Sequence, residues 1–80
     1  MSVRSDPDGG IALVGRCGSE DAEPLLQHLV ETEGAVVDLT GCESAHTAVI
    51  QVLLAARARA RGPAAGRFLR EWVEPLLSAG

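Results

Sequence analysis

The stretch VVDLTGCESAHTAVIQVLLAA, residues 36–56, places two apolar runs on either side of a short polar segment. The first run belongs to AVVDLT, residues 35–40, which is β-branched and almost wholly apolar, as in a strand covered on both faces. The second run repeats apolar residues three and four positions apart, which is the spacing of a helix face. The stretch therefore predicts a strand, a loop and a helix that begins near His46 and Thr47.

This helix is expected to run from about residue 45 to residue 61. Its last turns carry Arg57, Arg59 and Arg61, which suit the negative end of a helix dipole, and Gly62 and Pro63 follow as a stop signal. These arginines, with two more in the tail, are interpreted as a solvated helix end, and a patch for an acidic partner or anionic lipid is the alternative.

Two further elements are predicted before residue 36. IALVGRC, residues 11–17, is rich in aliphatic residues and predicts a strand. Residues 21–32 show apolar residues at helical spacing with acids in front of them, and they predict an amphipathic helix with Gly34 after its end. Residues 1–10 are polar and rich in turn-forming residues, so we expect a flexible N-terminus.

The tail after residue 62 is ambiguous. Phe68, Leu69, Trp72 and Leu76 recur at helical spacing, whereas Pro75 interrupts the pattern. We predict a helix over residues 65–74, and a further strand within residues 64–77 remains the alternative. The apolar residues are interpreted as part of the core, or alternatively as an exposed docking strip.

The predicted order of strand, helix, strand, helix and helix indicates a small α/β fold with parallel strands joined by right-handed crossovers. Eighty residues suffice for one domain, which we place at residues 11–80.

Composition argues against several classes of function. A net charge of −4 with one Trp, one Phe and no Tyr disfavours binding to nucleic acid. No apolar run approaches the roughly 20 residues of a membrane span, and the N-terminus lacks the layout of a secretory signal. We therefore expect a cytoplasmic protein without membrane insertion.

Potential metal and redox residues are few. Cys17, Cys42, His28 and His46 lack the close pairing that structural zinc sites show, so no metal site is predicted. Both cysteines are interpreted as buried residues without a disulfide. The sequence contains no glycine-rich phosphate loop and no nucleophile elbow, so we predict no catalytic residues, no cofactor and no enzymatic activity.

The strand IALVGRC, with Gly15 near its end, and the later VVDLTG, residues 36–41, resemble the STAS domain. This is the domain of bacterial anti-sigma factor antagonists and of the cytoplasmic tails of sulphate transporters, and the resemblance covers roughly residues 9–61. It implies a small sheet packed with helices, which here is either truncated at the C-terminus or completed by a strand in the tail. The family's Asp-Ser-Ser-Gly motif falls on residues 46–49, where only the first hydroxyl position is kept, as Thr47.

Members of the family that are switched by a serine/threonine kinase carry the phosphoacceptor inside this motif. The resemblance therefore implies that Thr47 is the candidate phosphoacceptor. It also implies that the loop and helix start bind a protein partner, of the anti-sigma factor or kinase type or a transporter subunit. The expected partner-binding residues are Gly41, Ser44, His46, Thr47 and Ile50.

Simpler interpretations of these residues remain open. Ser44 or Thr47 could satisfy the free N–H groups at the helix start, and Asp38 could cap the loop that follows its strand. The first functional hypothesis is a non-enzymatic regulatory interaction module in signal transduction, switched by phosphorylation. The alternative is a structural subunit of a larger assembly, such as a homodimer or an accessory component of an ABC transporter. That alternative predicts exposed apolar surface around Phe68, Trp72 and Leu76.

Overall fold

A computed structural model describes residues 3–6 and 9–79. Within them the chain forms, in order, β1 (Val3–Ser5), β2 (Ile11–Cys17), η1 (Ser19–Asp21), α1 (Ala22–Glu31), β3 (Val36–Ala45), α2 (Thr47–Ala55), β4 (Arg59–Arg61), η2 (Leu69–Val73), η3 (Glu74–Leu76) and β5 (Ser78–Ala79). The α/β class is therefore confirmed. No helix of the described residues is long and apolar enough to cross a bilayer.

The strands lie in the order in which they occur along the chain, β1-β2-β3-β4-β5. β1 is antiparallel to β2, and the β2–β3, β3–β4 and β4–β5 pairs are parallel, as predicted for strands that alternate with helices. Each parallel connection moves one strand further in the same direction. Right-handed crossovers that all move in one direction place their helices on one face of the sheet.

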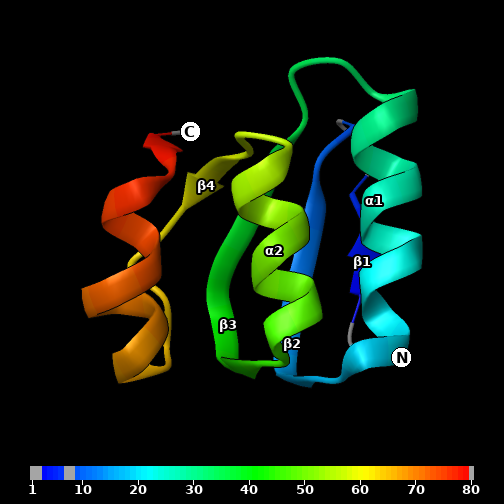
Figure 1. The fold of residues 1–80 in the computed structure, drawn as a ribbon. Coiled ribbons are helices and arrows are strands. Elements are labelled where there is room, and N and C mark those ends of the chain that lie inside the picture. The colour runs from blue at the N-terminus through cyan, green and yellow to red at the C-terminus, as the bar shows by residue number, and fades with distance from the viewer. Residues whose placement is uncertain (1–2, 7–8, 80) are drawn as a thin grey trace.

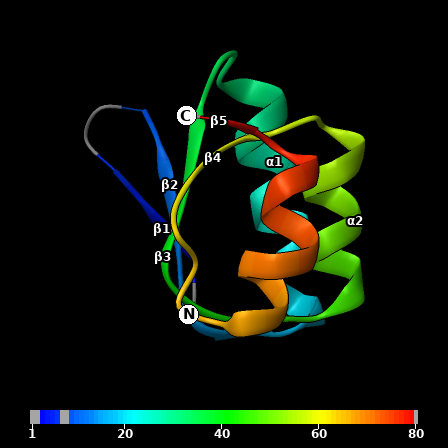
Figure 2. The same ribbon diagram turned by 90° about the vertical axis from the view of Figure 1, so that its left-hand side faces the viewer.

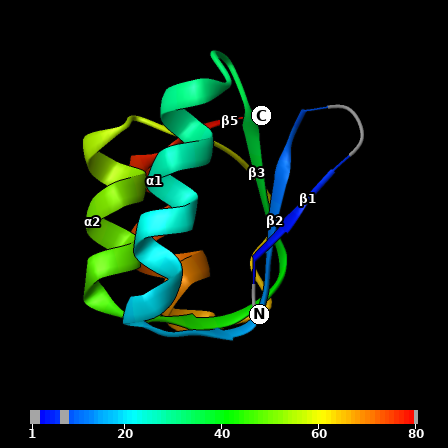
Figure 3. The same ribbon diagram turned by 90° about the vertical axis from the view of Figure 1, so that its right-hand side faces the viewer.

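All helices of the described residues accordingly cover the same face, as Figures 1, 2 and 3 show. We call α1, α2 and the C-terminal helix (residues 67–76, which contain η2 and η3) the helix layer. In Figure 1, α2 lies between the other two helices. The opposite side of the sheet, the far face, is covered by no helix of the described part of the chain.

The core lies between the sheet and the helix layer. Alternate residues of the central strands point into it, among them Leu13, Val37 and Leu39, each 0% exposed. Leu25, Leu53 and Leu69 enter from the three helices and are equally buried. Burial of apolar side chains of this size contributes about 1.5–3 kcal/mol each relative to an exposed position, so this layer supplies most of the stability of the fold.

The second helix is shorter than predicted, because α2 ends at Ala55 and not at residue 61. Arg57 adopts a positive φ of 50°. Its N–H donates to the Leu54 carbonyl, and the Ala58 N–H donates to the Leu53 carbonyl. This pair of bonds is a Schellman motif, which ends a helix.

Residues beyond that turn form β4, which pairs with the first residues of β3. Ala58 and Ala60 are buried, whereas Arg59 and Arg61 are exposed. The alternation in ARARAR is thus the period of a strand. The prediction of a helix here was wrong. It gave more weight to the high helix propensity of alanine and arginine than to their strand-like alternation.

The third strand is longer than predicted and continues through residues 41–45, where a polar loop was expected. These residues keep pairing with β2, from Val14 beside Gly41 to Cys17 beside Ala45. The register shifts twice along this pairing, and Gly15 in β2 has a φ of 69°, which suits a bulge. His46 alone separates β3 from α2.

Both ends of the chain contribute to the sheet. Val3–Ser5 pair with β2 as β1, although residues 1–10 are predicted to be flexible from sequence, and Val3 packs against the core. Residues 1, 2, 7 and 8 lie outside the described residues. The tail is helical over residues 67–76, which resolves its ambiguity in favour of a helix, and β4 and β5 complete the sheet that the resemblance left open.

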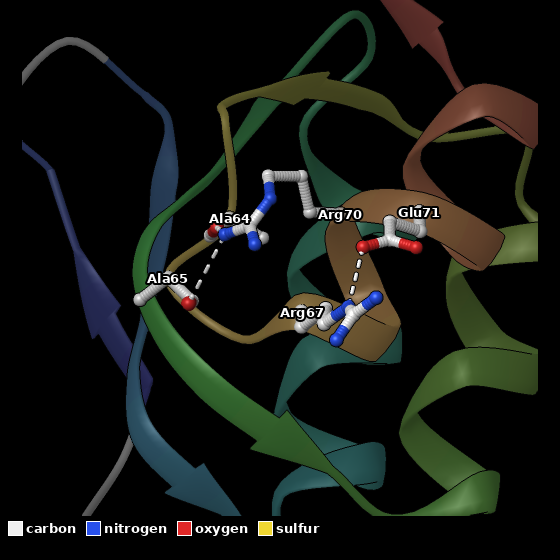
Figure 4. A network of polar contacts seen from close by, with 5 residues as sticks. All are labelled: Ala64, Ala65, Arg67, Arg70 and Glu71. Carbon is white, nitrogen blue, oxygen red and sulfur yellow. Dashed lines mark hydrogen bonds and ion pairs between the residues drawn. The ribbon is translucent and has the colours of Figure 1, made fainter.

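The C-terminal helix is fastened to the loop before it by two side chains. Arg70 Nη1 donates to the carbonyl oxygens of Ala64 (3.1 Å) and Ala65 (3.4 Å), as Figure 4 shows. The Ala64 N–H donates to Glu74 Oε1 at 2.8 Å. These bonds turn one side of the helix towards the loop, while Leu69 and Val73 face the core.

Candidate functional site

The predicted site lies where the carboxyl ends of β2 and β3 meet the start of α2. The His46 N–H donates to the carbonyl oxygen of Cys17, the last residue of β2, at 2.8 Å. This bond joins the end of β2 to the turn into α2. In sheets of parallel strands, ligands and partners commonly bind at the carboxyl edge, because loops and helix starts gather there.

His46 is the residue that caps α2. Its backbone is extended (φ −61°, ψ 151°), and its Nδ1 accepts a hydrogen bond from the Ala48 N–H at 3.0 Å. Its carbonyl oxygen also accepts from the N–H groups of Val49 and Ile50. The interpretation that Ser44 or Thr47 caps this helix is therefore wrong, because an imidazole nitrogen takes the place of the usual side-chain oxygen.

This use of His46 limits its chemistry. An Nδ1 that accepts from an amide is unprotonated, so the ring proton resides on Nε2. Nδ1 is thereby occupied by the helix and is not directed at the Thr47 hydroxyl. The imidazole is exposed, so its Nε2 edge remains available to solvent or to another molecule.

Thr47 is the first residue of α2, and its side chain is exposed. Within the described residues, its hydroxyl forms no hydrogen bond, and the side-chain cap of the helix is supplied by His46. Thr47 therefore presents an accessible hydroxyl beside the positive end of the helix dipole.

The other predicted partner-binding residues lie at three places. Ser44 is exposed near the end of β3, close in sequence to His46 and Thr47. Ile50 lies one turn inside α2 and packs partly against the core. Gly41 lies in the middle of β3 beside Val14, away from the helix start. The structure thus brings Ser44, His46 and Thr47 together at the helix start and separates Gly41 from them.

The interpretation that Asp38 caps a loop after its strand is wrong, because no loop follows it there and β3 continues for seven residues beyond it. Asp38 lies in the row of paired residues that joins Ala12 of β2 to Arg61 of β4. Asp38 Oδ1 accepts hydrogen bonds from the Thr40 hydroxyl (2.6 Å) and the Thr40 N–H (2.9 Å). These bonds, and to a smaller extent the charge of Arg61, lower the pKa of Asp38.

Arginines at the end of the chain do not form one patch. Arg59 and Arg61 lie on the far face of the sheet, opposite the buried Ala60. Arg67 Nε pairs with Glu71 Oε2 at 2.7 Å on the C-terminal helix (Figure 4), and Arg70 binds the preceding loop. The structure therefore does not bring these arginines together into a single surface for an acidic partner.

The two cysteines are buried free thiols on neighbouring strands, as interpreted from the sequence. Their sulfur atoms lie 3.9 Å apart. Burial raises the pKa of Cys17, and burial together with the neighbouring Cys17 raises the pKa of Cys42 to about 12. Both groups remain protonated at neutral pH, which is typical of structural rather than reactive cysteines.

Two polar residues have structural roles that the sequence does not reveal. Asp21 is 2% exposed, and its Oδ2 accepts from the Gly18 N–H at 2.9 Å, so it fixes the turn into α1. His28 Nε2 donates to the Gly9 carbonyl oxygen at 2.8 Å and ties α1 to the β1–β2 connection. The available signal for Asp21 was an acid placed three residues after a glycine, ahead of a helix.

A second candidate surface lies on the outside of the helix layer. Phe68, Trp72 and Leu76 are 62%, 68% and 70% exposed, whereas Leu69 and Val73 between them are buried. The expectation of exposed apolar surface at these three positions is confirmed. Of the four apolar residues interpreted as core, only Leu69 is buried, and Val73 is buried beside it.

No group of three or more His, Cys, Asp or Glu residues in the described part of the chain is arranged to hold a metal ion. Comparison with models of protein families, with curated proteins and with solved structures found no match to this chain.

Proposed function

We propose that the protein is a non-enzymatic interaction module that presents the start of α2 to a protein partner. The observation that carries this proposal is that His46, and not Thr47, caps the helix. His46 completes the helix start with its own side chain, so the neighbouring Thr47 hydroxyl is exposed and left unused by the fold. An exposed polar group that the fold does not need is available for recognition.

Phosphorylation of Thr47 is the modification that fits this geometry. A phosphate adds about 1.5 to 2 negative charges at neutral pH, and at the first residue of α2 these charges lie at the favourable end of the helix dipole. The helix therefore tolerates the modification, while the surface offered to the partner gains negative charge. Resemblance to kinase-switched STAS domains supports this assignment.

Affinity purification from the native cell, followed by mass spectrometry, identifies the partner and any phosphate on Thr47. Binding of the purified partner is then measured by calorimetry for Thr47→Ala and Thr47→Glu, with Thr40→Ala as the matched control. Thr40 is also exposed but points to the far face beside Asp38. We expect the Thr47 variants to change the affinity and the control to leave it unchanged. Unchanged affinity in both Thr47 variants refutes the site.

The second candidate function is that of a structural subunit without a switch. The exposed apolar side chains of Phe68, Trp72 and Leu76 favour it, because isolated soluble domains seldom expose several large apolar residues on one helix. This candidate uses the helix layer, whereas the first uses the end of α2. Variants at Trp72 and at Thr47 therefore distinguish the two functions in the same binding assay.

A further inference from the structure

A shallow apolar groove runs between α1 and α2 on the outside of the helix layer. It has a volume of about 480 Å³. Its lining residues are Ala22, Glu23, Leu26, Gln27 and Val30 from α1 and Val52 from α2. Leu26 is 45% exposed and Val30 is 75% exposed. The groove therefore offers apolar walls with a carboxylate at one side, which suits an apolar helix that also carries positive charge.

The same layer exposes a helix of that description. Phe68, Trp72 and Leu76 are spaced four residues apart and form an apolar stripe along the C-terminal helix. Leu69 and Val73 turn another side of this helix to the core, and Arg70 turns a third side to the preceding loop. The stripe is left on the side that faces outward. No other segment of the described chain covers it.

Groove and stripe lie on opposite sides of α2. Figure 1 shows α1 on one side of α2 and the C-terminal helix on the other. When two such layers pack face to face about a two-fold axis parallel to the helices and passing over α2, the stripe of each copy meets the groove of the other. In an isologous dimer of this kind the contact between stripe and groove forms twice, so both copies have their stripe and their groove covered.

Charge is compatible with the same arrangement. Residues 17–56, which include α1 and α2, contain no arginine. The C-terminal helix carries two arginines and two glutamates; Arg70 binds the preceding loop, and Arg67, with an 83% exposed side chain, pairs with Glu71. Face-to-face packing brings Arg67 of one copy towards Glu23 beside the groove of the other, so the contact has opposite charges at that end.

We infer that the occupant of the groove is a second copy of this chain, and that the protein forms a two-fold dimer through its helix layer. The inference rests on the second candidate function and names its partner. Trp72 is the anchor residue, because a large aromatic side chain at the centre of a contact usually carries much of the binding energy. His46 and Thr47 at the start of α2 belong neither to the stripe nor to the lining of the groove.

Sedimentation over a range from low micromolar to near-millimolar protein tests the dimer. Trp72 is the single tryptophan and the chain has no tyrosine, so its fluorescence reports directly on the contact. We expect a concentration-dependent dimer with a blue shift of the emission. Val30→Glu and Trp72→Glu are expected to raise the dissociation constant by about 30-fold or more. Val14→Glu on the far face, where Val14 is 42% exposed, is the control and leaves the dimer intact.

Mixing the two disruptive variants sharpens the test. The Val30→Glu chain keeps an intact stripe and the Trp72→Glu chain keeps an intact groove, so a mixed dimer has one undamaged contact. Only the Val30→Glu chain carries a tryptophan, and its emission shifts to the blue on mixing if that contact forms.

Two results overturn the inference. One is a wild-type chain that sediments as a monomer at every concentration with solvent-exposed tryptophan emission. The other is a dimer that Val14→Glu disrupts as strongly as Trp72→Glu. In the first case, binding of the monomer to a different protein through Trp72 leaves the second candidate function standing. Binding at Thr47 is measured with another protein and is unaffected by either result.

Discussion

Stability in alkaline solution depends on the two buried cysteines. Cys42 is 0% exposed and Cys17 is 4% exposed. Burial first, and then the neighbouring Cys17, raises the pKa of Cys42 from its ordinary value of 9.0 to about 12, and burial raises the pKa of Cys17. The chain contains neither lysine nor tyrosine, and all seven basic residues are arginines. Cysteines are therefore the side chains that titrate between pH 9 and pH 12.

The direction of the effect follows from proton linkage. Above pH 9 the unfolded chain loses its thiol protons, whereas the folded chain retains the Cys42 proton up to about pH 12. The unfolded state then binds fewer protons, so the free energy of unfolding falls as the pH rises. For Cys42 the slope is at most about 1.4 kcal/mol per pH unit, which gives a loss of up to about 4 kcal/mol across the window. Stability is fully retained below pH 9.

Urea denaturation at a series of pH values from 8 to 11, in the presence of a phosphine reductant, measures this loss. Circular dichroism is the suitable signal, because Trp72 is largely exposed and reports poorly on the core. The Cys17→Ala, Cys42→Ala double variant starts from a lower stability but is expected to show a flat profile. If the double variant loses stability with pH as steeply as the wild type, the assignment to the cysteines is wrong.

Three substitutions test local features of the fold by the same denaturation assay at neutral pH. His46→Ala removes the cap of α2 and is expected to cost about 1 kcal/mol, whereas His46→Asp supplies another acceptor and costs less; equal losses would contradict the capping role. Arg57→Gly relieves a left-handed conformation worth about 1–2 kcal/mol and adds about 0.5–1 kcal/mol of chain entropy to the unfolded state, so a net gain of about 0.5–1 kcal/mol is expected. Gly66→Ala places a Cβ against the Glu43 carbonyl group, which belongs to the backbone of β3 and cannot swing aside as a side chain would, and is expected to destabilise by about 1–3 kcal/mol; a neutral result would refute this close approach.

The central part of the fold can be predicted from the sequence, because each segment there shows a single apolar spacing, either that of a strand or that of a helix. Strand 11–17 matches β2, and the helix predicted at residues 21–32 differs from α1 by one residue at each end. In the strand, the aliphatic composition and the burial agree. In the helix, the apolar spacing, the acids at its start and the glycine after its end all indicate the same bounds. Agreement between local signals and the fold is what makes such segments predictable.

Prediction failed where two signals conflicted. ARARAR has helical composition and strand period, and the left-handed Arg57 that separates α2 from β4 is a conformation that glycine usually adopts. The extension of β3 through residues 41–45 depends on pairing with β2, which is a tertiary contact. At the candidate site the position of the helix start was predictable to within two residues. The use of His46 as its cap was not, because histidine is an uncommon N-cap residue.

The distribution of side chains on the two outer surfaces bears on how the protein associates. The far face of the sheet carries Arg59, Arg61 and the bonded pair of Asp38 and Thr40, although a bare sheet face is where apolar residues could have gathered. The two edge strands, β1 and β5, are only three and two residues long, and short edge strands oppose pairing with another sheet. The large exposed apolar side chains are concentrated instead on the helix layer, whose backbone hydrogen bonds are already satisfied within each helix. The order of the crossovers puts every described helix on one face and thereby separates the two surfaces. Association through side-chain packing on the helix layer is therefore favoured over addition of a strand to the sheet.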